Sequence, residues 1–275
     1  MPSFLSGQRA AITGGAGELC GAMAVALADA GVKVAIIDLR PDPAAALAKS
    51  IRERGGEALS LCADVTSRPE LDSAAEKIRS EFGGLEILLN GAGGNHPGAT
   101  TSDVQSFFEL DAEAVRKVFE LNCLGTILPC QVLGRLIVDT VKRTGGFGNI
   151  VNLSSMNAFR PLTRIPAYSA AKAAVSNFTQ WLCVHLAQNY TPRVRVNAIA
   201  PGFFLTEQNR FLLMDRESGE FTERGRSILA HSPSGRLGEP GDLLSALFWL
   251  LDPASGFVNG VVVPVDGGFN AYSGV

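Results

Sequence analysis

The sequence predicts one α/β domain, a doubly wound parallel sheet with helices on both faces. Two observations predict this class. Short apolar runs rich in β-branched residues alternate with alanine-rich helical stretches along the whole chain. The 275 residues contain no repeat, low-complexity segment or linker that would separate a second domain, and this length suits one large domain with a substantial core. Residues 1–275 are therefore expected to form a single domain.

The predicted strands are continuous apolar runs, because each strand of a covered parallel sheet is buried on both faces. The first is followed by a glycine-rich turn, and the second ends at an aspartate. In chain order the predicted strands cover residues 9–13, 32–38, 57–63, 85–90, 148–153, 194–199 and 261–265.

The predicted helices lie between these strands. Gly31 ends the first helix and Gly55 with Gly56 closes the second, as glycine commonly does at helix C-termini. The fourth is expected to be one long helix. In chain order the predicted helices cover residues 17–30, 44–54, 69–82, 111–141, 166–189 and 239–251.

Two long segments, 93–110 and 203–236, interrupt this alternation after the fourth and sixth strands. Ligands of such sheets bind beyond the carboxyl ends of the strands, and long loops in a compact domain are usually functional or disordered. Both segments are therefore expected to cover a substrate. The second contains helix-compatible stretches and mixed charges, which favours a lid.

Composition excludes several classes of partner. The net charge of −3 without a basic block argues against nucleic acid and a membrane surface. We expect no signal peptide, because the residues before the first strand lack a charged region followed by an apolar one, and no apolar run is long enough to predict a membrane span. The five cysteines are scattered and lack CxxC spacing, which is typical of reduced thiols in the cytoplasm. The three histidines lie far apart, so no metal site is predicted.

The turn after the first strand, residues 13–21 (TGGAGELCG), predicts a Rossmann-type dinucleotide site. Its glycines let the backbone approach a pyrophosphate at the N-terminus of the first helix. Asp38, at the end of the second strand, is placed to accept the adenosine ribose hydroxyls of NAD and to repel the 2′-phosphate of NADP. Two alternatives remain: Arg40 favours NADP, and Asp38 caps the next helix.

Ser155, Tyr168 and Lys172 have the spacing Ser-x12-Tyr-x3-Lys, which predicts a proton-transfer site. Tyr168 and Lys172 share one face of a helix. An ammonium about 4 Å from a phenolate stabilises it by about 4 kcal/mol at an effective dielectric constant of about 20. This amounts to roughly three pKa units, enough to bring a tyrosine from about 10 towards neutrality. Ser155 is expected to hydrogen-bond the reacting oxygen. The alternative is a solvated pair on an amphipathic helix.

Together these motifs resemble those of the short-chain dehydrogenase/reductase superfamily, in order and over essentially the whole chain. The resemblance implies that Tyr168 is the catalytic acid and base, that Lys172 tunes it and binds the nicotinamide ribose, and that Ser155 orients the carbonyl. It also implies that Asn122 holds a helix kink and a water in a proton relay. The remaining cofactor contacts that it implies are Thr13, Gly14, Gly17, Glu18, Leu19, Asp64, Val65, Asn90, Ala92, Pro201, Gly202 and Thr206.

Some of these residues have plainer alternatives. Asn122 could be a buried polar residue that bonds backbone, and Asp64 a turn residue. The chain also departs from the superfamily pattern: the usual TGxxxGxG has glycines where Glu18 and Cys20 stand, and the usual NNAG is NGAG, with Gly91 as its second residue. Glu18 adds an unfavourable charge near a pyrophosphate unless it points to solvent.

Four further segments, 90–98, 154–168, 200–210 and the C-terminal tail, resemble the subgroup of D-mannonate oxidoreductases, also called fructuronate reductases. An arginine suits a carboxylate and amides suit sugar hydroxyls. Arg160 is the first choice for the carboxylate because it follows Ser155 closely; it and Arg164 could also be surface charges, and His96 could only shape a turn. The expected substrate contacts are Asn95, His96, Asn157, Arg160 and Asn209, with Arg164 and Arg210 as further candidates.

The sequence therefore indicates an NAD-dependent oxidoreductase that reduces D-fructuronate to D-mannonate. A gluconate-type or other polyol dehydrogenase is the alternative, and a non-catalytic dinucleotide-binding protein is a remote one. By analogy with the superfamily, we expect a homotetramer assembled through the helices at 111–141 and 166–189.

Overall fold

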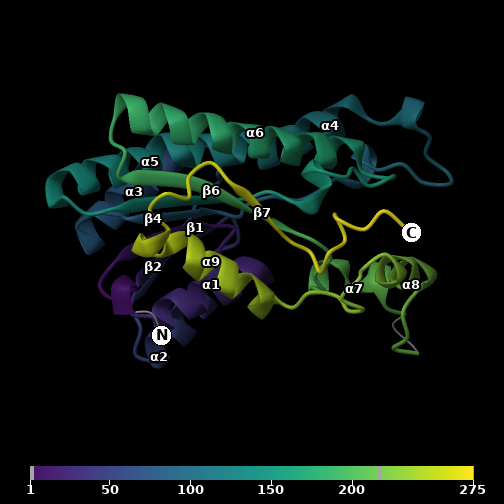
Figure 1. The fold of residues 1–275 in the computed structure, drawn as a ribbon, viewed down its shortest axis with the longest axis horizontal. Coiled ribbons are helices and arrows are strands. Elements are labelled where there is room, and N and C mark those ends of the chain that lie inside the picture. The colour runs from purple at the N-terminus through teal and green to yellow at the C-terminus, as the bar shows by residue number, and fades with distance from the viewer. Residues whose placement is uncertain (1–2, 216–217, 275) are drawn as a thin grey trace.

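A computed structural model describes residues 3–215 and 218–274, and it has a three-layer architecture with one sheet between two layers of helices (Figure 1). The seven strands are all parallel, in the order β3-β2-β1-β4-β5-β6-β7. This confirms the predicted fold class. The strands are β1 (Arg9–Thr13), β2 (Lys33–Asp38), β3 (Ala58–Cys62), β4 (Ile87–Asn90), β5 (Gly148–Leu153), β6 (Val194–Pro201) and β7 (Val262–Val265).

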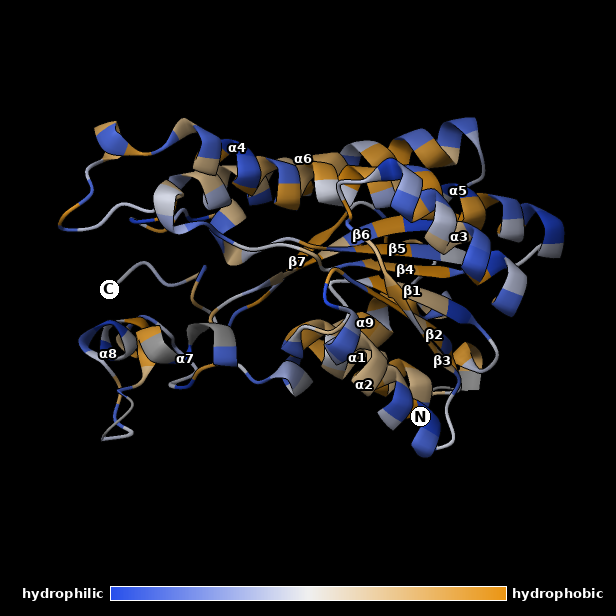
Figure 2. Ribbon diagram, turned by 180° about the vertical axis from the view of Figure 1, so that it is seen from behind, coloured by the Kyte–Doolittle hydropathy of each residue, from blue (hydrophilic) through white to orange (hydrophobic). Residues whose placement is uncertain are grey.

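One face of the sheet is covered by α1 (Glu18–Asp29), α2 (Pro41–Glu53) and α9 (Leu244–Leu251). The other is covered by α3 (Arg68–Phe82), α5 (Gly125–Thr144) and α6 (Pro166–Asn189). Each layer buries its own apolar cluster against the sheet, and Figure 2 shows the strands between them as the most hydrophobic part of the ribbon. Burial on both faces explains why the strand sequences are continuously apolar.

The predicted helix 111–141 is interrupted. The structure has α4 (Ala112–Phe119), a π-helical turn (Glu120–Leu124) and then α5. A π-turn inserts an extra residue into a helix and is common at functional sites. Asn122 lies in this turn, and its side chain bonds outside the helix as well as within it. Helical periodicity alone does not reveal such an insertion.

The run from Ala112 to Thr144 is long and apolar enough to cross a membrane by length and composition, but 61% of its most apolar window is buried inside the protein. Its side chains pack with α3 and the central strands. Burial of this extent is the pattern of a core helix.

Both long segments contain structure beyond the carboxyl ends of the strands. The segment 93–110 holds the short 3-10 turns Pro97–Ala99 and Phe107–Glu109. The segment 203–236 holds α7 (Glu207–Leu213) and α8 (Glu223–Ala230), which pack together away from the sheet (Figure 1). Leu213 and Ile228 form a small apolar core there with Leu237, the residue that follows the segment. We call residues 203–236 the lid segment.

Smaller corrections concern helix ends. The predicted helix 239–251 is a 3-10 turn, Pro240–Leu243, followed by α9. Further 3-10 turns are Ser3–Leu5, Met156–Ala158 and Pro253–Ser255.

Candidate active site

A cavity of about 910 Å³ opens at the carboxyl ends of the strands and joins most of the predicted site. It is lined from the turns after β1, β2, β3 and β4, from the loop after β5, from α6, and from the lid segment. The predicted residues that line it are Gly14, Gly17, Glu18, Leu19, Asp38, Asp64, Val65, Ala92, Asn95, Ser155, Asn157, Tyr168, Lys172, Pro201, Gly202 and Thr206.

Ser155, Tyr168 and Lys172 meet at one wall of this cavity. Ser155 follows β5 and is 7% exposed, and its side chain hydrogen-bonds the Tyr168 hydroxyl. The Lys172 Nζ lies 5.7 Å from the centre of the Tyr168 ring and donates to the Leu153 carbonyl at 2.8 Å. The three side chains therefore converge, because α6 packs against the end of β5.

The pKa values differ from the sequence-based expectation. Burial raises the pKa of the Tyr168 hydroxyl, and the hydrogen bond with Ser155 offsets this only in part. Burial is also the main cause of the shift at Lys172, where it lowers the pKa to about 8, and the nearby Cys20 acts to raise it. The expected depression of the tyrosine pKa is absent because desolvation, the largest cause of both shifts, disfavours the charged form of each side chain. At neutral pH this tyrosine carries its proton and is suited to act as an acid.

Asn122 is fully buried and does not line the cavity. Its Oδ1 accepts from the Gly94 amide at 3.2 Å, and its Nδ2 donates to the carbonyls of Gly94 and Val118 at 2.7 and 2.8 Å. Asn122 is therefore a buried polar residue whose side chain hydrogen-bonds backbone groups, as in the plainer alternative. Through them it ties the π-turn to the loop after β4.

The glycine-rich turn has the shape that a dinucleotide requires. Gly14 has a φ of +60°, and a Cβ there would lie 2.8 Å from the backbone of Ala92. Gly17 caps α1 without a side-chain hydrogen bond, so the first amides of the helix face the cavity without a competing side chain. Such a helix N-terminus suits a pyrophosphate. These residues fit a nicotinamide dinucleotide, which would lie between this turn and Tyr168.

Cys20 and Gly91, two departures from the superfamily pattern, are in contact. Cys20 is buried at the first turn of α1, and a Cβ on Gly91 would lie 2.0 Å from its Sγ. The cysteine occupies the space that an asparagine at position 91 would need. Each substitution therefore accommodates the other. Burial raises the pKa of the Cys20 thiol to about 12, so this thiol is protonated and acts as an apolar packing group.

Asp38 is buried at the end of β2, and its carboxylate accepts hydrogen bonds from the amides of Ala16 and Arg40 at 3.1 and 3.0 Å. Burial acts to raise its pKa, but the bonds from Arg40 and Ala16 prevail and leave the pKa lowered. The N-cap of α2 is Arg40, so Asp38 is not a helix cap. The Arg40 guanidinium also donates to Oδ1 at 3.1 Å and to Oδ2 at 3.5 Å, so about four acceptor positions of the carboxylate are all occupied. A ribose hydroxyl would replace the long bond from Arg40 to Oδ2.

Two expected cofactor contacts lie beneath the cavity wall. The Thr13 hydroxyl accepts from the amides of Gly91 and Ala92, and Asn90 donates to Asn152 at 2.9 Å within the core. Both are almost fully buried and line no part of the cavity. They support its wall because strand-end side chains alternate between the two faces of the sheet. Asp64 lines the cavity and is also a turn residue, since its Oδ1 binds Thr66.

Glu18 is exposed, and its Oε2 accepts from the Glu207 amide at 2.9 Å. Its carboxylate thus reaches the first residue of α7 and connects α1 to the lid segment. This contact gives Glu18 a partner and turns its charge towards the lid.

Some of the expected substrate contacts line the cavity and others do not. Asn95 and Asn157 line the cavity, and the buried Oδ1 of Asn157 has no hydrogen-bond partner among the described residues. Arg160 is exposed and lines neither this cavity nor the smaller one beside it, so its position does not support Arg160 as the first choice for the carboxylate. His96 accepts from the Gly98 amide through Nδ1 at 3.1 Å, which is the turn-shaping alternative. The side chain of Asn209 lies outside the described residues.

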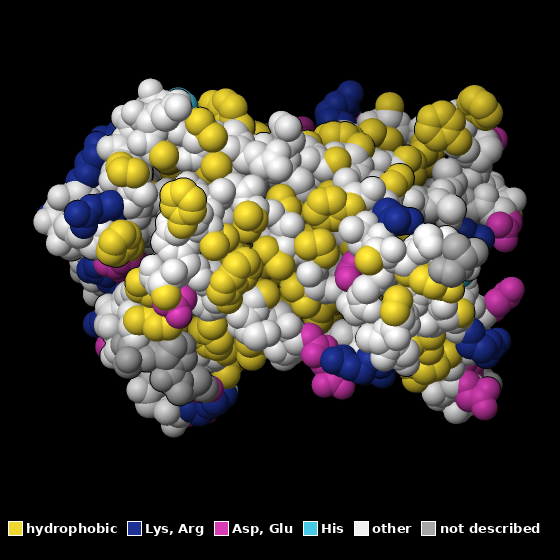
Figure 3. Space-filling model, in the orientation of Figure 1, with side chains coloured by type: hydrophobic (Ala, Val, Ile, Leu, Met, Phe, Trp, Pro, Cys, Tyr) yellow, Lys and Arg dark blue, Asp and Glu magenta, His cyan; other side chains and the backbone are white. Residues whose placement is uncertain are grey.

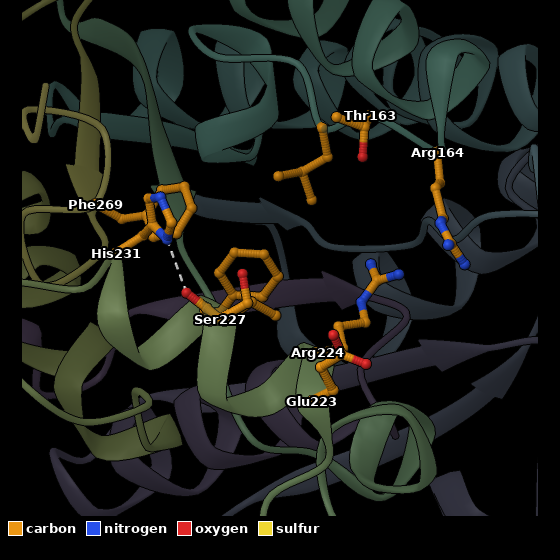
Figure 4. Close-up of a pocket in the computed structure, with 10 residues that line it drawn as sticks. Thr163, Arg164, Glu223, Arg224, Ser227, His231 and Phe269 are labelled. Carbon is orange, nitrogen blue, oxygen red and sulfur yellow. Dashed lines mark hydrogen bonds between the residues drawn. The ribbon is translucent and has the colours of Figure 1, made fainter. Parts of the chain in front are cut away.

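A second cavity of about 580 Å³ adjoins the first and shares Leu162, Phe203 and Arg224 with it (Figure 4). Arg224, on α8, was missed by the sequence analysis. No sequence motif indicates a role for Arg224. A charged residue near the start of a helix usually faces solvent, so its position in the sequence did not suggest a binding site. Arg164, by contrast, was a candidate and lines the second cavity. Arg210 pairs with Glu207 on its own helix.

Comparison with known proteins agrees with this geometry. A sequence profile described as "short chain dehydrogenase" matches residues 8–217. The chain is 48% identical to the uncharacterized oxidoreductase UxuB of Bacillus subtilis strain 168, over 98% of both chains. A crystal structure of a candidate D-mannonate oxidoreductase from Haemophilus influenza with bound NAD is 44% identical over 98% of both chains, with a TM-score of 0.91. A gluconate 5-dehydrogenase from Burkholderia cenocepacia in complex with NADP and tartrate is 28% identical, with a TM-score of 0.83, over 97% of this chain and 96% of that one.

The contact between Cys20 and Gly91 predicts a coupled pair of substitutions. Gly91→Asn alone should lower the free energy of unfolding by about 1–3 kcal/mol, as overpacking of a filled core does. Cys20→Gly removes the sulfur, so the double variant should recover part of this loss. Urea unfolding of the four proteins measures the coupling. Strictly additive losses would show that the two positions do not compete for space.

The pKa of Lys172 predicts a pH dependence. Above about pH 8 the buried ammonium loses its proton and no longer stabilises the phenolate left by proton transfer. The kcat/KM for ketone reduction should be flat below pH 8 and fall towards tenfold per pH unit above it. Lys172→Arg keeps a cation at all these pH values and should abolish the decline, even with a lower rate. A wild-type profile that is flat to pH 10 contradicts this assignment.

Proposed function

The chain belongs to the short-chain dehydrogenase family, and on that premise we propose that it is an NAD-dependent oxidoreductase that converts D-fructuronate and NADH into D-mannonate and NAD. The observation that carries the proposal is the continuous cavity that joins the glycine-rich turn to the Ser155–Tyr168 hydrogen bond and extends to polar and cationic side chains. The 44% identity with the candidate D-mannonate oxidoreductase supports the choice of substrate.

The mechanism follows from three side chains. A bound nicotinamide supplies the hydride that reduces the ketone carbon. Ser155 orients the ketone oxygen by a hydrogen bond, and Tyr168 donates its proton to that oxygen as the alcohol forms. Lys172 lies close enough to stabilise the resulting phenolate. In the reverse direction the phenolate of Tyr168 removes the proton of the alcohol. Asn122 and a water would return the proton through Lys172.

Amides near the reacting oxygen support a polyhydroxylated substrate. Asn157 lines the cavity, and its buried Oδ1 has no hydrogen-bond partner among the described residues, which is costly for a polar atom. A substrate hydroxyl would satisfy it. Asn95 donates to Thr100 at 2.8 Å and stands at the outer rim. A gluconate-type dehydrogenase is the second candidate, favoured by the similarity to the gluconate 5-dehydrogenase.

We also propose a homotetramer in the cytoplasm. Large apolar side chains such as Trp181 on α6 and Trp249 on α9 are about half exposed, and Figure 3 shows hydrophobic side chains gathered over the centre of one face. Exposed apolar patches of this kind favour association. The five cysteines are all free, which suits a reducing compartment.

A screen of sugar acids tests the proposed function. With NADH, the loss of nicotinamide absorbance should be fastest with D-fructuronate, and slower with 5-keto-D-gluconate. Tyr168→Phe lacks the transferable proton and should lower kcat at least about 10²-fold while NADH still binds. A wild type that reduces 5-keto-D-gluconate faster favours the second candidate. A phenylalanine variant that keeps more than about a third of the turnover removes Tyr168 from the mechanism.

Asp38 predicts the choice of cofactor. Its carboxylate would repel a 2′-phosphate, so kcat/KM should be at least about tenfold higher with NADH than with NADPH. Asp38→Ala should narrow this ratio, and Arg40→Met should lower whatever NADPH activity remains. Equal use of both cofactors by the wild type would mean that Arg40, which pairs with Asp38 at 3.1 Å, screens the carboxylate.

A further inference from the structure

Two arginines face each other across the second cavity. Arg164 lies on the loop that joins Ser155 to α6, and Arg224 lies on α8 of the lid segment. Figure 4 shows both side chains directed into the space between these elements. The positive charge of Arg164 lowers the pKa of Arg224, after burial as the larger cause. Two cations held this close disfavour each other unless an anion lies between them.

No carboxylate in residues 3–215 and 218–274 neutralises Arg224. Glu223 also lines the cavity but is exposed and forms no ion pair within that part of the chain. Arg164 pairs with Asp103 at 3.3 Å, but the Asp103 side chain is 92% exposed. Exposed pairs of this kind contribute little. The partly buried guanidinium of Arg224 thus faces the cavity, and its N–H groups are available to a bound anion.

The position of this pair suits the far end of a substrate. Arg224 lines both cavities, and so does Leu162 on the same loop as Arg164. That loop begins at Ser155 and leads directly into the helix turn that carries Tyr168. A molecule with its ketone at Ser155 and Tyr168 would therefore extend past Leu162 towards the two arginines.

We propose that Arg224, together with Arg164, binds the carboxylate of the substrate and selects acids over neutral keto-sugars. This rests on the proposed function and deepens it. Guanidinium groups bind a carboxylate bidentately through charge-assisted hydrogen bonds. Because Arg224 belongs to the lid segment and Arg164 to the loop beside the reacting oxygen, one carboxylate connects the lid to the catalytic wall.

Substrate pairs test the role of Arg224. D-fructuronate and D-fructose share the ketone but differ in the carboxylate, and D-fructose 6-phosphate carries a phosphate instead. Arg224→Met should lower kcat/KM for fructuronate at least about tenfold and for fructose less than about threefold. Arg164→Met should act in the same sense. If the wild type prefers the sugar phosphate, and Arg224→Met removes that preference, the carboxylate assignment is overturned.

Two arginines serve as controls. Arg226 lies on the same helix as Arg224, is exposed, and donates to the Phe221 carbonyl. Arg226→Met should therefore leave kcat/KM unchanged for both fructuronate and fructose. Arg160→Met replaces an exposed arginine on the same loop as Arg164, and it should also behave as the wild type. A loss specific to fructuronate in Arg160→Met, with none in Arg224→Met, overturns the proposal and restores Arg160 as the carboxylate partner.

Binding without turnover separates the two proposals. Calorimetric titration of D-mannonate into protein loaded with NADH forms a complex that does not react. The wild type and Arg226→Met should bind alike, and Arg224→Met at least about tenfold more weakly. Strong wild-type activity on fructuronate with unchanged mannonate binding in Arg224→Met contradicts only the arginine pair. If the wild type binds mannonate in a way that depends on Arg224 but reduces no sugar acid, only the proposed reaction is contradicted. No binding of the acid to the wild type contradicts both.

Discussion

The backbone that follows β4, residues 91–94, is enclosed on three sides, and the geometry of the site depends on this packing. Gly91 contacts the sulfur of Cys20, Ala92 lies against Gly14, and Gly93 approaches Asn122 and Lys172. A Cβ at Gly91 or Gly93 would come closer to these neighbours than normal packing allows. Protein cores resist such changes because they are packed as densely as crystals. The glycine-rich turn, the π-turn and the lysine of α6 are thereby fixed relative to one another.

Burial has a second consequence, which is electrostatic. Lys172 is 4% exposed, and within residues 3–215 and 218–274 its ammonium makes one hydrogen bond, to the Leu153 carbonyl. Its ammonium is therefore only weakly favoured over the neutral amine, and its pKa falls to about 8. The neighbouring tyrosine shares the low-dielectric surroundings, which keep its proton in place. The same surroundings strengthen any charge interaction that develops during proton transfer. The site thus disfavours its charged forms before the reaction, and charge that develops during proton transfer is poorly screened by water.

The lid segment adds parts that the rigid sheet does not supply. It has its own small apolar core around Ile228, and it meets the body of the protein through the bond from the Glu207 amide to Glu18. Arg224 enters the cavity from this segment. Chemistry is therefore built on β5 and α6, whereas recognition of the far end of the substrate is shared with the lid. Such a division lets relatives keep one reaction and change substrates by changing lids.

The sequence by itself determined the fold and the reacting groups. Strands such as β1, β5 and helix α6 were predicted with the bounds that the structure has, because continuous apolar runs and glycine-rich turns act locally. The spacing of Ser155, Tyr168 and Lys172 was sufficient to identify them, since it depends only on one strand end and one helix. Only the tertiary structure decided that Asn90 and Thr13 support the wall, that Cys20 and Gly91 compensate each other, and that Tyr168 has a raised pKa. It also decided that Arg224, and not Arg160, faces the cavity. These features depend on where side chains from distant segments meet and on how much water they exclude, which no local pattern encodes.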